Sequence, residues 1–310
     1  MIHFPESYDT IEVPAGAVVR SAGTDLQERL RSHNATPTIV DLTGIAGFAG
    51  IDVTAERIRI GGGTTMATVA RELHPTHPAL AIATGSLATP QVRARGTIAG
   101  NLTQHTRCWY LRHPGIDCFK SGGDSCLART GRHLYGVAFD RSDCVHPHPS
   151  TIAMALRCYD ASIALADGSS RTLDEVLGDG TDATRDHQLA DGEVIAAIEL
   201  GPGWDGERGA YFRSISRFEA EWPLVEAVVR ARFDGDVVAE CRLAIGGVAT
   251  VPLAMEAAAS SLVGSRLTGE RIGQAAALCT EGASPLPETG YKVSLIEATV
   301  RETLERLRDH

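Results

Sequence analysis

Four of the seven cysteines lie within residues 104–148, and this segment restricts the folding of the chain more than any other feature. They are Cys108, Cys118, Cys126 and Cys144, at spacings of 10, 8 and 18 positions in a glycine-containing loop. Four thiolates are the ligand set of an iron–sulfur cubane, because each iron takes one soft sulfur ligand. The pattern therefore predicts a [4Fe–4S] cluster on these four cysteines.

Other interpretations of the four cysteines stay open. Structural zinc favours close C-x₂₋₄-C pairs, which are absent here, and a disulfide fits poorly with a reducing compartment. The third alternative is that no metal binds. We expect Arg107, Arg112 and Lys120 to offset thiolate charge, and Gly122 and Gly123 to let backbone N–H groups approach the sulfurs. The histidines of the segment are expected to be solvated loop residues; they are His105, His113, His133, His146 and His148.

Three glycine-rich stretches have the local pattern of a nucleotide site. SAGTDL (21–26) and GGGTT (61–65) each follow a predicted strand and open a predicted helix, where backbone N–H groups favour anions. GTIAGN (96–101) adds hydroxyl and amide side chains that can hydrogen-bond a phosphate or a flavin edge. None is a G-x-G-x-x-G fingerprint or a P-loop, and each alone can be an ordinary turn. Three together favour a dinucleotide, which needs several backbone approaches at once.

The apolar pattern predicts an α+β protein that changes character near a Gly- and Pro-rich linker at 200–209. Before the linker, the expected strands are 17–21, 38–42, 57–63 and 161–167, and the expected helices are 24–33, 64–73 and 150–161. The polar stretch at 167–190 is expected to add little core. After the linker, Asp234-Gly235 lies between two apolar runs and predicts a hairpin, which three helical segments follow.

Charge and hydropathy exclude several classes of protein. The formal net charge of −10 argues against binding to nucleic acid or a membrane surface, because neutralising phosphates needs an excess of Lys and Arg. No apolar run reaches the roughly 20 residues of a membrane helix. The start MIHFPESYDT lacks the pattern of a secretory signal. We therefore expect a cytoplasmic protein.

The order of these motifs resembles the FAD-binding medium subunit of the molybdenum hydroxylases, the family of xanthine dehydrogenase and carbon monoxide dehydrogenase. The resemblance runs from SAGTDL through IGGGTT, PQVRARGTIAGN and an HPS helix start to LAIGGVA and YKVSL. The cysteine segment, beginning RCWYLR, is similar to the subset with an additional [4Fe–4S] cluster, which includes the flavoprotein subunits of 4-hydroxybenzoyl-CoA reductase and a bacterial aldehyde oxidoreductase.

The resemblance implies a fold and a set of cofactor-binding residues. A two-part α/β FAD-binding domain of the PCMH type would span residues 1–200, with the iron–sulfur loop 104–148 inserted, and an antiparallel sheet backed by helices would span 209–310. The implied FAD-binding residues are Ala22, Gly23, Thr24 and Asp25 in a pyrophosphate loop; Gly61, Gly62, Gly63, Thr64 and Thr65 in a second phosphate loop; Gly96, Thr97, Ile98, Ala99, Gly100 and Asn101 facing the flavin; and Lys292. No residue is singled out as catalytic.

Three positions depart from the family pattern. Ala22 and Ala99 replace glycines, and the first adds a methyl group where the backbone should approach pyrophosphate. Thr151 stands where the family has an aspartate, so a carboxylate expected near the flavin is missing. These changes predict weaker FAD binding than a full match would.

The function that the resemblance implies is electron transfer. The chain would be an FAD- and [4Fe–4S]-containing subunit that passes electrons between its flavin and the iron–sulfur and molybdopterin centres of partner subunits, with NAD or another electron acceptor at the flavin. A chain of 310 residues without a plant-type C-x₄-C-x₂-C run implies a molybdopterin-binding large subunit and a small iron–sulfur subunit as partners. Two alternatives remain: a stand-alone flavoenzyme acting on a small substrate, and a metal-stabilised binding module that has lost FAD.

Overall fold

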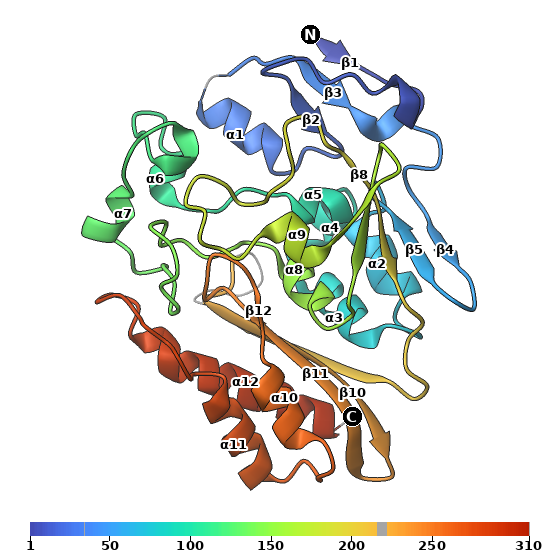
Figure 1. Ribbon diagram of the computed structural model, residues 1–310, viewed down its shortest axis with the longest axis vertical. Coiled ribbons are helices and arrows are strands. Elements are labelled where there is room, and N and C mark those ends of the chain that lie inside the picture. Colours follow the sequence, from blue (N-terminus) through green and yellow to red (C-terminus); the bar gives the residue numbers. More distant parts are fainter. Residues whose placement is uncertain (34, 216–221, 310) are drawn as a thin grey trace.

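The computed structural model describes residues 1–33, 35–215 and 222–309, and its strands form three sheets (Figure 1). The first sheet is parallel, in the order β1 (Ile2–His3), β3 (Ile39–Asp41) and β2 (Val18–Arg20). The second is antiparallel, in the order β4 (Ile51–Val53), β5 (Ile58–Gly61), β8 (Ile195–Leu200), β6 (Ser162–Leu165) and β7 (Ser170–Thr172). The chain thus leaves the second sheet after β5 and returns to it at β6.

Between β5 and β6 the chain forms helices and the cysteine segment. The helices of the first two-thirds of the chain are α1 (Leu26–Ser32), α2 (Met66–Glu72), α3 (Pro78–Ser86), α4 (Pro90–Arg93), α5 (Ile98–Leu102), α6 (Trp109–Arg112), α7 (Leu127–Thr130), α8 (Thr151–Leu156) and α9 (Leu173–Leu177), with 3₁₀ turns at Tyr8–Thr10, Leu42–Gly44 and Phe119–Ser121. Side-chain hydroxyl groups cap the N-termini of α2, α5 and α8. The hydroxyls of Thr65, Thr97 and Ser150 accept hydrogen bonds from the backbone N–H groups of Thr68, Gly100 and Ala153, respectively.

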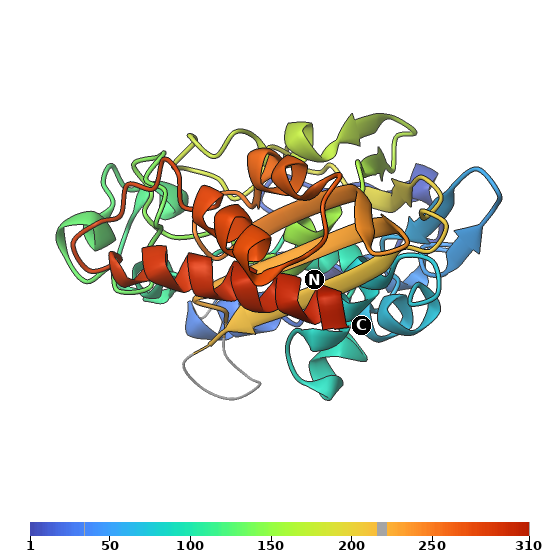
Figure 2. The same ribbon diagram turned by 90° about the horizontal axis from the view of Figure 1, so that it is seen from below.

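The third sheet is antiparallel and carries three helices on one face (Figure 2). Its order is β12 (Leu253–Ala254), β11 (Val237–Gly246), β10 (Val225–Asp234) and β9 (Arg208–Ser214). The predicted hairpin is confirmed: Asp234 pairs with Val237, and Gly235 takes the positive φ of +58° that the turn requires. The helices are α10 (Glu256–Leu262), α11 (Gly269–Leu278) and α12 (Tyr291–Asp309). Helix α12 buries Ile296, Val300, Leu304 and Leu307, the spacing of one helical face.

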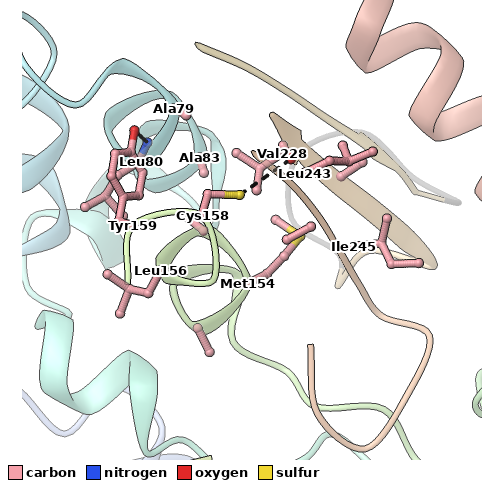
Figure 3. Packing of buried hydrophobic residues seen from close by; sticks show 14 of the residues in the cluster. Ala79, Leu80, Ala83, Met154, Leu156, Cys158, Tyr159, Val228, Leu243 and Ile245 are labelled. Atoms are coloured by element: carbon pink, nitrogen blue, oxygen red, sulfur yellow. Dashed lines mark hydrogen bonds between the residues drawn. The ribbon is translucent and has the colours of Figure 1, made fainter. Parts of the chain in front are cut away.

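One hydrophobic core joins the third sheet to the rest of the chain (Figure 3). Met154 and Cys158, at and just after α8, lie between α3 and the strands β10 and β11, where Val228 and Leu243 are buried. Cys158, Cys241 and Cys279 are all buried free thiols, as predicted for small apolar groups. The prediction of an α+β fold is confirmed, although the second sheet is antiparallel where the alternating pattern suggested α/β units.

One sequence expectation about the core was wrong. The stretch 167–190 contributes β7 and α9. Leu173, Val176 and Leu177 are buried because α9 presents one apolar face to the second sheet. Residues of the expected linker at 200–209 pack against β10. Glu207 of the linker forms a buried ion pair with Arg230 at 2.7 Å, and the Arg230 guanidinium stacks on Trp204 at 3.6 Å.

Within the described residues, no helix combines the length and the apolar character that a membrane crossing requires.

Candidate functional site

Two adjoining cavities lie between the first sheet and the helices that follow β5. The first, here called the loop cavity, has a volume of about 520 Å³ and is lined by the loop 21–25, by Thr97, Ala99 and Gly100, and by residues 187–195. The second, the middle cavity, measures about 220 Å³. They share Thr24, Asp25, Thr97, Gly100 and Gln104, so together they form one continuous groove.

The loop after β2 presents unpaired backbone donors to this groove. Among the described residues, the N–H groups of Ala22, Gly23 and Thr24 donate no hydrogen bond. Gly23 has φ +73°, so this glycine supplies the left-handed turn, whereas Ala22 is an exposed residue without positive φ. The extra methyl group of Ala22 is therefore compatible with the loop. Free N–H groups on a tight turn are a site for an anion such as a pyrophosphate.

The predicted flavin-facing segment also lines the groove, except for one residue. Gly96, Thr97, Gly100 and Asn101 line the middle cavity, and Ala99 lines the loop cavity. Ile98 is fully buried in the core. Asn101 uses its Oδ1 to accept a hydrogen bond from Ser150 Oγ at 2.8 Å, which joins the segment to the start of α8.

The second predicted phosphate loop, Gly61–Thr65, lines neither cavity. Its backbone is occupied internally: Gly62 N donates to Ala196 O, and Gly62 O and Thr64 O accept from Ala99 N and Ile98 N. A Cβ on Gly63 would lie 2.5 Å from the Phe48 ring, so glycine is required there for packing. In the structure this turn is the scaffold that holds residues 96–101 against the groove.

A buried carboxylate, which the sequence interpretation missed, stands next to Thr151. Glu226 is 1% exposed, and its Oε2 accepts hydrogen bonds from Thr151 Oγ1 and Tyr211 OH, both at 2.8 Å. Burial raises the pKa of this carboxyl to about 7. A carboxylate from β10 thus lies in hydrogen-bonding contact with Thr151. An acidic residue within an apolar run was the available signal in the sequence.

A third cavity, the aromatic cavity, adjoins the groove and is lined largely by the cysteine segment. It has a volume of about 290 Å³, and its walls include Trp109, Tyr135 and Trp222 together with Glu226 and Lys292. It shares Arg107, Trp222 and Pro223 with the middle cavity.

Lys292 lies in the wall of the aromatic cavity and lines neither part of the groove. The side chain is 1% exposed, and its Nζ donates to Gly247 O at 2.7 Å. Burial lowers the pKa of this ammonium group to about 7.

The four cysteines converge on one small space, here called the thiol cavity. Cys108, Cys118, Cys126 and Cys144 all line it, and its volume is about 20 Å³. It shares Cys108, Tyr110, Ala128 and His146 with the aromatic cavity. Within the described ranges, no three His, Cys, Asp or Glu side chains are arranged so as to hold a metal ion. The donor set suits a soft metal cluster in number and in chemistry.

Two of the thiols, those of Cys108 and Cys144, are held protonated by burial. Burial raises the pKa of Cys108, and it raises the pKa of Cys144 to about 11, although the charge of Lys120 acts in the opposite direction.

The turn after Cys118 needs glycine at two positions. Gly122 has φ +95°, and a Cβ on Gly123 would lie 2.8 Å from the Asp117 carbonyl group.

Two expectations about the cysteine segment were wrong. Arg107 and Arg112 do not face the sulfurs as free charges, because both donate to Asp25. His146 and His148 are not solvated. Both belong to the stretch between Cys144 and α8, and burial lowers the pKa of each imidazole to about 4.

Carboxylates from three distant parts of the chain anchor the cysteine segment, which stands beside α1 and the start of α12 (Figure 1). Asp25 accepts hydrogen bonds from Arg107 and Arg112 near the start of the segment. Asp186, whose side chain is 6% exposed, accepts from Lys120 Nζ at 3.0 Å and from His105 Nδ1 at 3.1 Å. Glu288 accepts from His133 N at 2.7 Å. Besides its own small apolar cluster of Cys108, Ala128, Val137 and Val145, the segment is therefore held by ion pairs and hydrogen bonds to its neighbours.

Comparisons with known proteins define the class. Residues 6–202 match the family described as the FAD binding domain in molybdopterin dehydrogenase, and residues 210–307 match the CO dehydrogenase flavoprotein C-terminal domain. The chain belongs to this family, and it is the FAD-binding flavoprotein subunit of an oxidoreductase of the molybdopterin dehydrogenase type. The resemblance inferred from the motifs is confirmed.

Individual relatives extend over almost the whole chain. The aldehyde oxidoreductase FAD-binding subunit PaoB of Escherichia coli K12 is 29% identical over 325 residues, which cover 97% of this chain and 98% of PaoB. Reconstituted CO dehydrogenase from Oligotropha carboxidovorans matches with a TM-score of 0.74 at 20% identity, covering 99% and 97% of the two chains. Quinoline 2-oxidoreductase from Pseudomonas putida 86 matches with a TM-score of 0.73 at 18% identity, covering 99% and 96%. The two structures establish the fold.

Proposed function

We propose that this chain is the electron-transfer subunit of a molybdenum hydroxylase-type enzyme and carries FAD in the groove and a [4Fe–4S] cluster on Cys108, Cys118, Cys126 and Cys144. The observation that carries the proposal is a series of adjoining cavities. The groove shares residues with the aromatic cavity, and the aromatic cavity shares residues with the thiol cavity. When bound, FAD supplies two-electron chemistry and the cluster supplies one-electron chemistry.

The residues of the groove fit the dinucleotide. The N–H groups of Ala22, Gly23 and Thr24 bind the pyrophosphate, and the fixed turn at Gly23 aims them. The Gly61–Thr65 turn positions Thr97 and Gly100 at the wall of the groove. Glu226, at the wall of the aromatic cavity beside Thr151, holds a proton close to neutral pH. In this proposal, residues 1–200 form the FAD-binding domain and residues 209–310 form the C-terminal domain.

The cysteine segment fits a cluster by the convergence of its thiols. Binding requires their deprotonation, and Lys120 lies near enough to lower the pKa of Cys144. Trp109 and Tyr135, whose rings contact edge to face with centroids 5.3 Å apart, form part of the wall between the thiols and the groove.

We further propose that substrate oxidation takes place in partner chains, a molybdopterin-binding large subunit and a small iron–sulfur subunit. PaoB is named as one subunit of an aldehyde oxidoreductase, and this chain spans almost the whole length of PaoB. NAD or another acceptor exchanges electrons with the flavin.

The test is an absorption spectrum of the anaerobically purified protein, with flavin, iron and sulfide measured on the same sample. We expect flavin bands over a broad shoulder near ~400 nm and about four irons per chain. Cys108→Ser and Cys126→Ser should each lose the iron, whereas the control Cys279→Ala, a buried thiol outside the segment, should keep it. Flavin without iron in the wild type would remove the cluster from the proposal. Iron without flavin would show a metal-stabilised module that has lost FAD.

A further inference from the structure

In the pyrophosphate loop, the side chain of Asp25 is bound to another part of the chain. Its Oδ1 accepts from Arg107 Nη1 at 2.5 Å and from Arg112 Nη2 at 2.9 Å, and its Oδ2 accepts from His105 N at 3.2 Å. Its own loop supplies the free N–H groups of residues 22–24. A single carboxylate thus joins the groove to both ends of the turn that contains Cys108.

This connection is buried enough to be rigid. The side chains of Asp25, Arg107 and Arg112 are 14%, 16% and 12% exposed. Burial alone would raise the pKa of Asp25, but the two guanidinium groups outweigh it and lower the pKa below its usual range, so the carboxylate stays charged. A charged, shared acceptor of this kind fixes two donors at once.

Arg112 passes the constraint to the backbone of the cysteine segment. Its Nε donates to Thr106 O at 3.2 Å and its Nη2 donates to His105 O at 3.1 Å, so this guanidinium closes residues 105–112 into a compact turn. Arg107 also donates to Gln104 Oε1 at 2.9 Å, and Gln104 lines both parts of the groove. The loop 22–25 and the turn that carries Cys108 are therefore linked by a continuous set of hydrogen bonds.

We propose that Asp25 is a positioning residue that couples occupancy of the FAD groove to closure of the cysteine segment. A dinucleotide that orders the loop 22–25 fixes Asp25, and Asp25 fixes Arg107 and Arg112 around Cys108. The coupling is reciprocal by linkage, so an ordered cysteine segment tightens FAD binding. This inference rests on the proposed binding of FAD to the groove.

The test measures the rate at which a thiol reagent labels Cys118 and Cys126, both partly exposed, in metal-free protein with and without FAD. In the wild type we expect saturating FAD to slow the labelling by about fivefold or more, the lower range of coupling between sites. In Asp25→Asn the labelling should be equally fast with and without FAD. Arg112→Gln should behave in the same way, and it serves as the second variant if Asp25→Asn does not fold.

Asp41→Asn is the matched control. Asp41 is also a buried carboxylate of the first part of the chain, paired with Arg20 at 2.5 Å and hydrogen-bonded to Thr43. Among the residues that the structure describes, no hydrogen bond or ion pair joins it to the cysteine segment. It should keep the FAD-dependent slowing. Conservative Arg112→Lys, which retains the charge, should restore part of it.

FAD binding is followed separately by flavin fluorescence. If FAD binds and slows the labelling equally in the wild type and in Asp25→Asn, the inference is overturned while the FAD site stands. The same holds if bound FAD leaves the labelling of the wild type unchanged. If FAD does not bind the wild type, the proposed function fails and the inference fails with it.

Discussion

Glu226 is a carboxylic acid enclosed by hydroxyl groups, and its folded-state pKa of about 7 makes stability depend on pH. In an unfolded chain a glutamate has a pKa of about 4.3. Between these values the folded protein holds a proton that the unfolded chain has released. The stabilisation from this proton is present below about pH 4 and is lost as the pH rises through 7.

Glu226→Gln should remove this dependence, because the amide keeps the shape of the side chain without a charge. Relative to the wild type, the free energy of unfolding of Glu226→Gln should rise by about 2–3 kcal/mol between pH 5 and pH 8. Urea unfolding at several pH values measures it. Glu226→Asp keeps the acid and serves as the control. A constant difference between Glu226→Gln and the wild type over this range would contradict the assigned burial.

At the scale of elements, the strand-to-loop-to-helix unit of β2 and α1 has one position that needs glycine. Gly23 has φ +73°, and a Cβ there would lie 3.1 Å from Arg20 Cδ, whereas Ala22 already carries a methyl group on the open side. We therefore expect the departure of Ala22 from the family pattern to affect FAD binding less than a change at Gly23 would.

Gly23→Ala should weaken FAD binding by about tenfold, because a left-handed conformation costs an L-residue roughly 1–2 kcal/mol. Ala22→Gly should change the Kd by less than about twofold, since the position needs no positive φ. Fluorescence titration of the FAD-free protein gives both constants. The opposite order, with a large gain for Ala22→Gly and no loss for Gly23→Ala, would show that the pyrophosphate lies against Ala22.

At the scale of the whole molecule, the two family segments share one core. Met154 and Leu80 from the first part are buried together with Val228 and Ile245 of the third sheet (Figure 3). Glu207 and Arg230 add a buried ion pair at the same junction. The division into two segments along the sequence therefore does not divide the molecule into two independent cores.

We expect calorimetry to show one unfolding transition, with equal calorimetric and van't Hoff enthalpies. Met154→Ala should lower the stability of the whole protein by roughly 2–5 kcal/mol, because it opens a cavity at the junction. FAD should raise the temperature of the same single transition. Two separate transitions, of which only one responds to Met154→Ala, would contradict a shared core.

The sequence predicted the local features of this molecule and missed the distant ones. The hairpin at Gly235, the helix start at Ser150 and the glycine turn at Gly23 follow from short patterns, because the backbone conformation decides them within a few residues. The anchoring of Arg107 by Asp25 joins residues 82 positions apart, and no local signal marks it. The role of Glu226 was not predicted, because both faces of β10 are buried there and the strand shows no alternation of polar and apolar residues.

The anchors of the cysteine segment also bear on the order in which the chain folds during synthesis. Glu288 holds His133, and Lys292 donates to Tyr135 O, so residues near the end of the chain complete the shape of a loop made much earlier. On a ribosome that synthesises the chain from its N-terminus, the thiols emerge long before these partners do. Metal delivered during translation would meet an unclosed loop. The cysteine segment therefore reaches its final shape only once residues 288–292 have been synthesised and have folded against it.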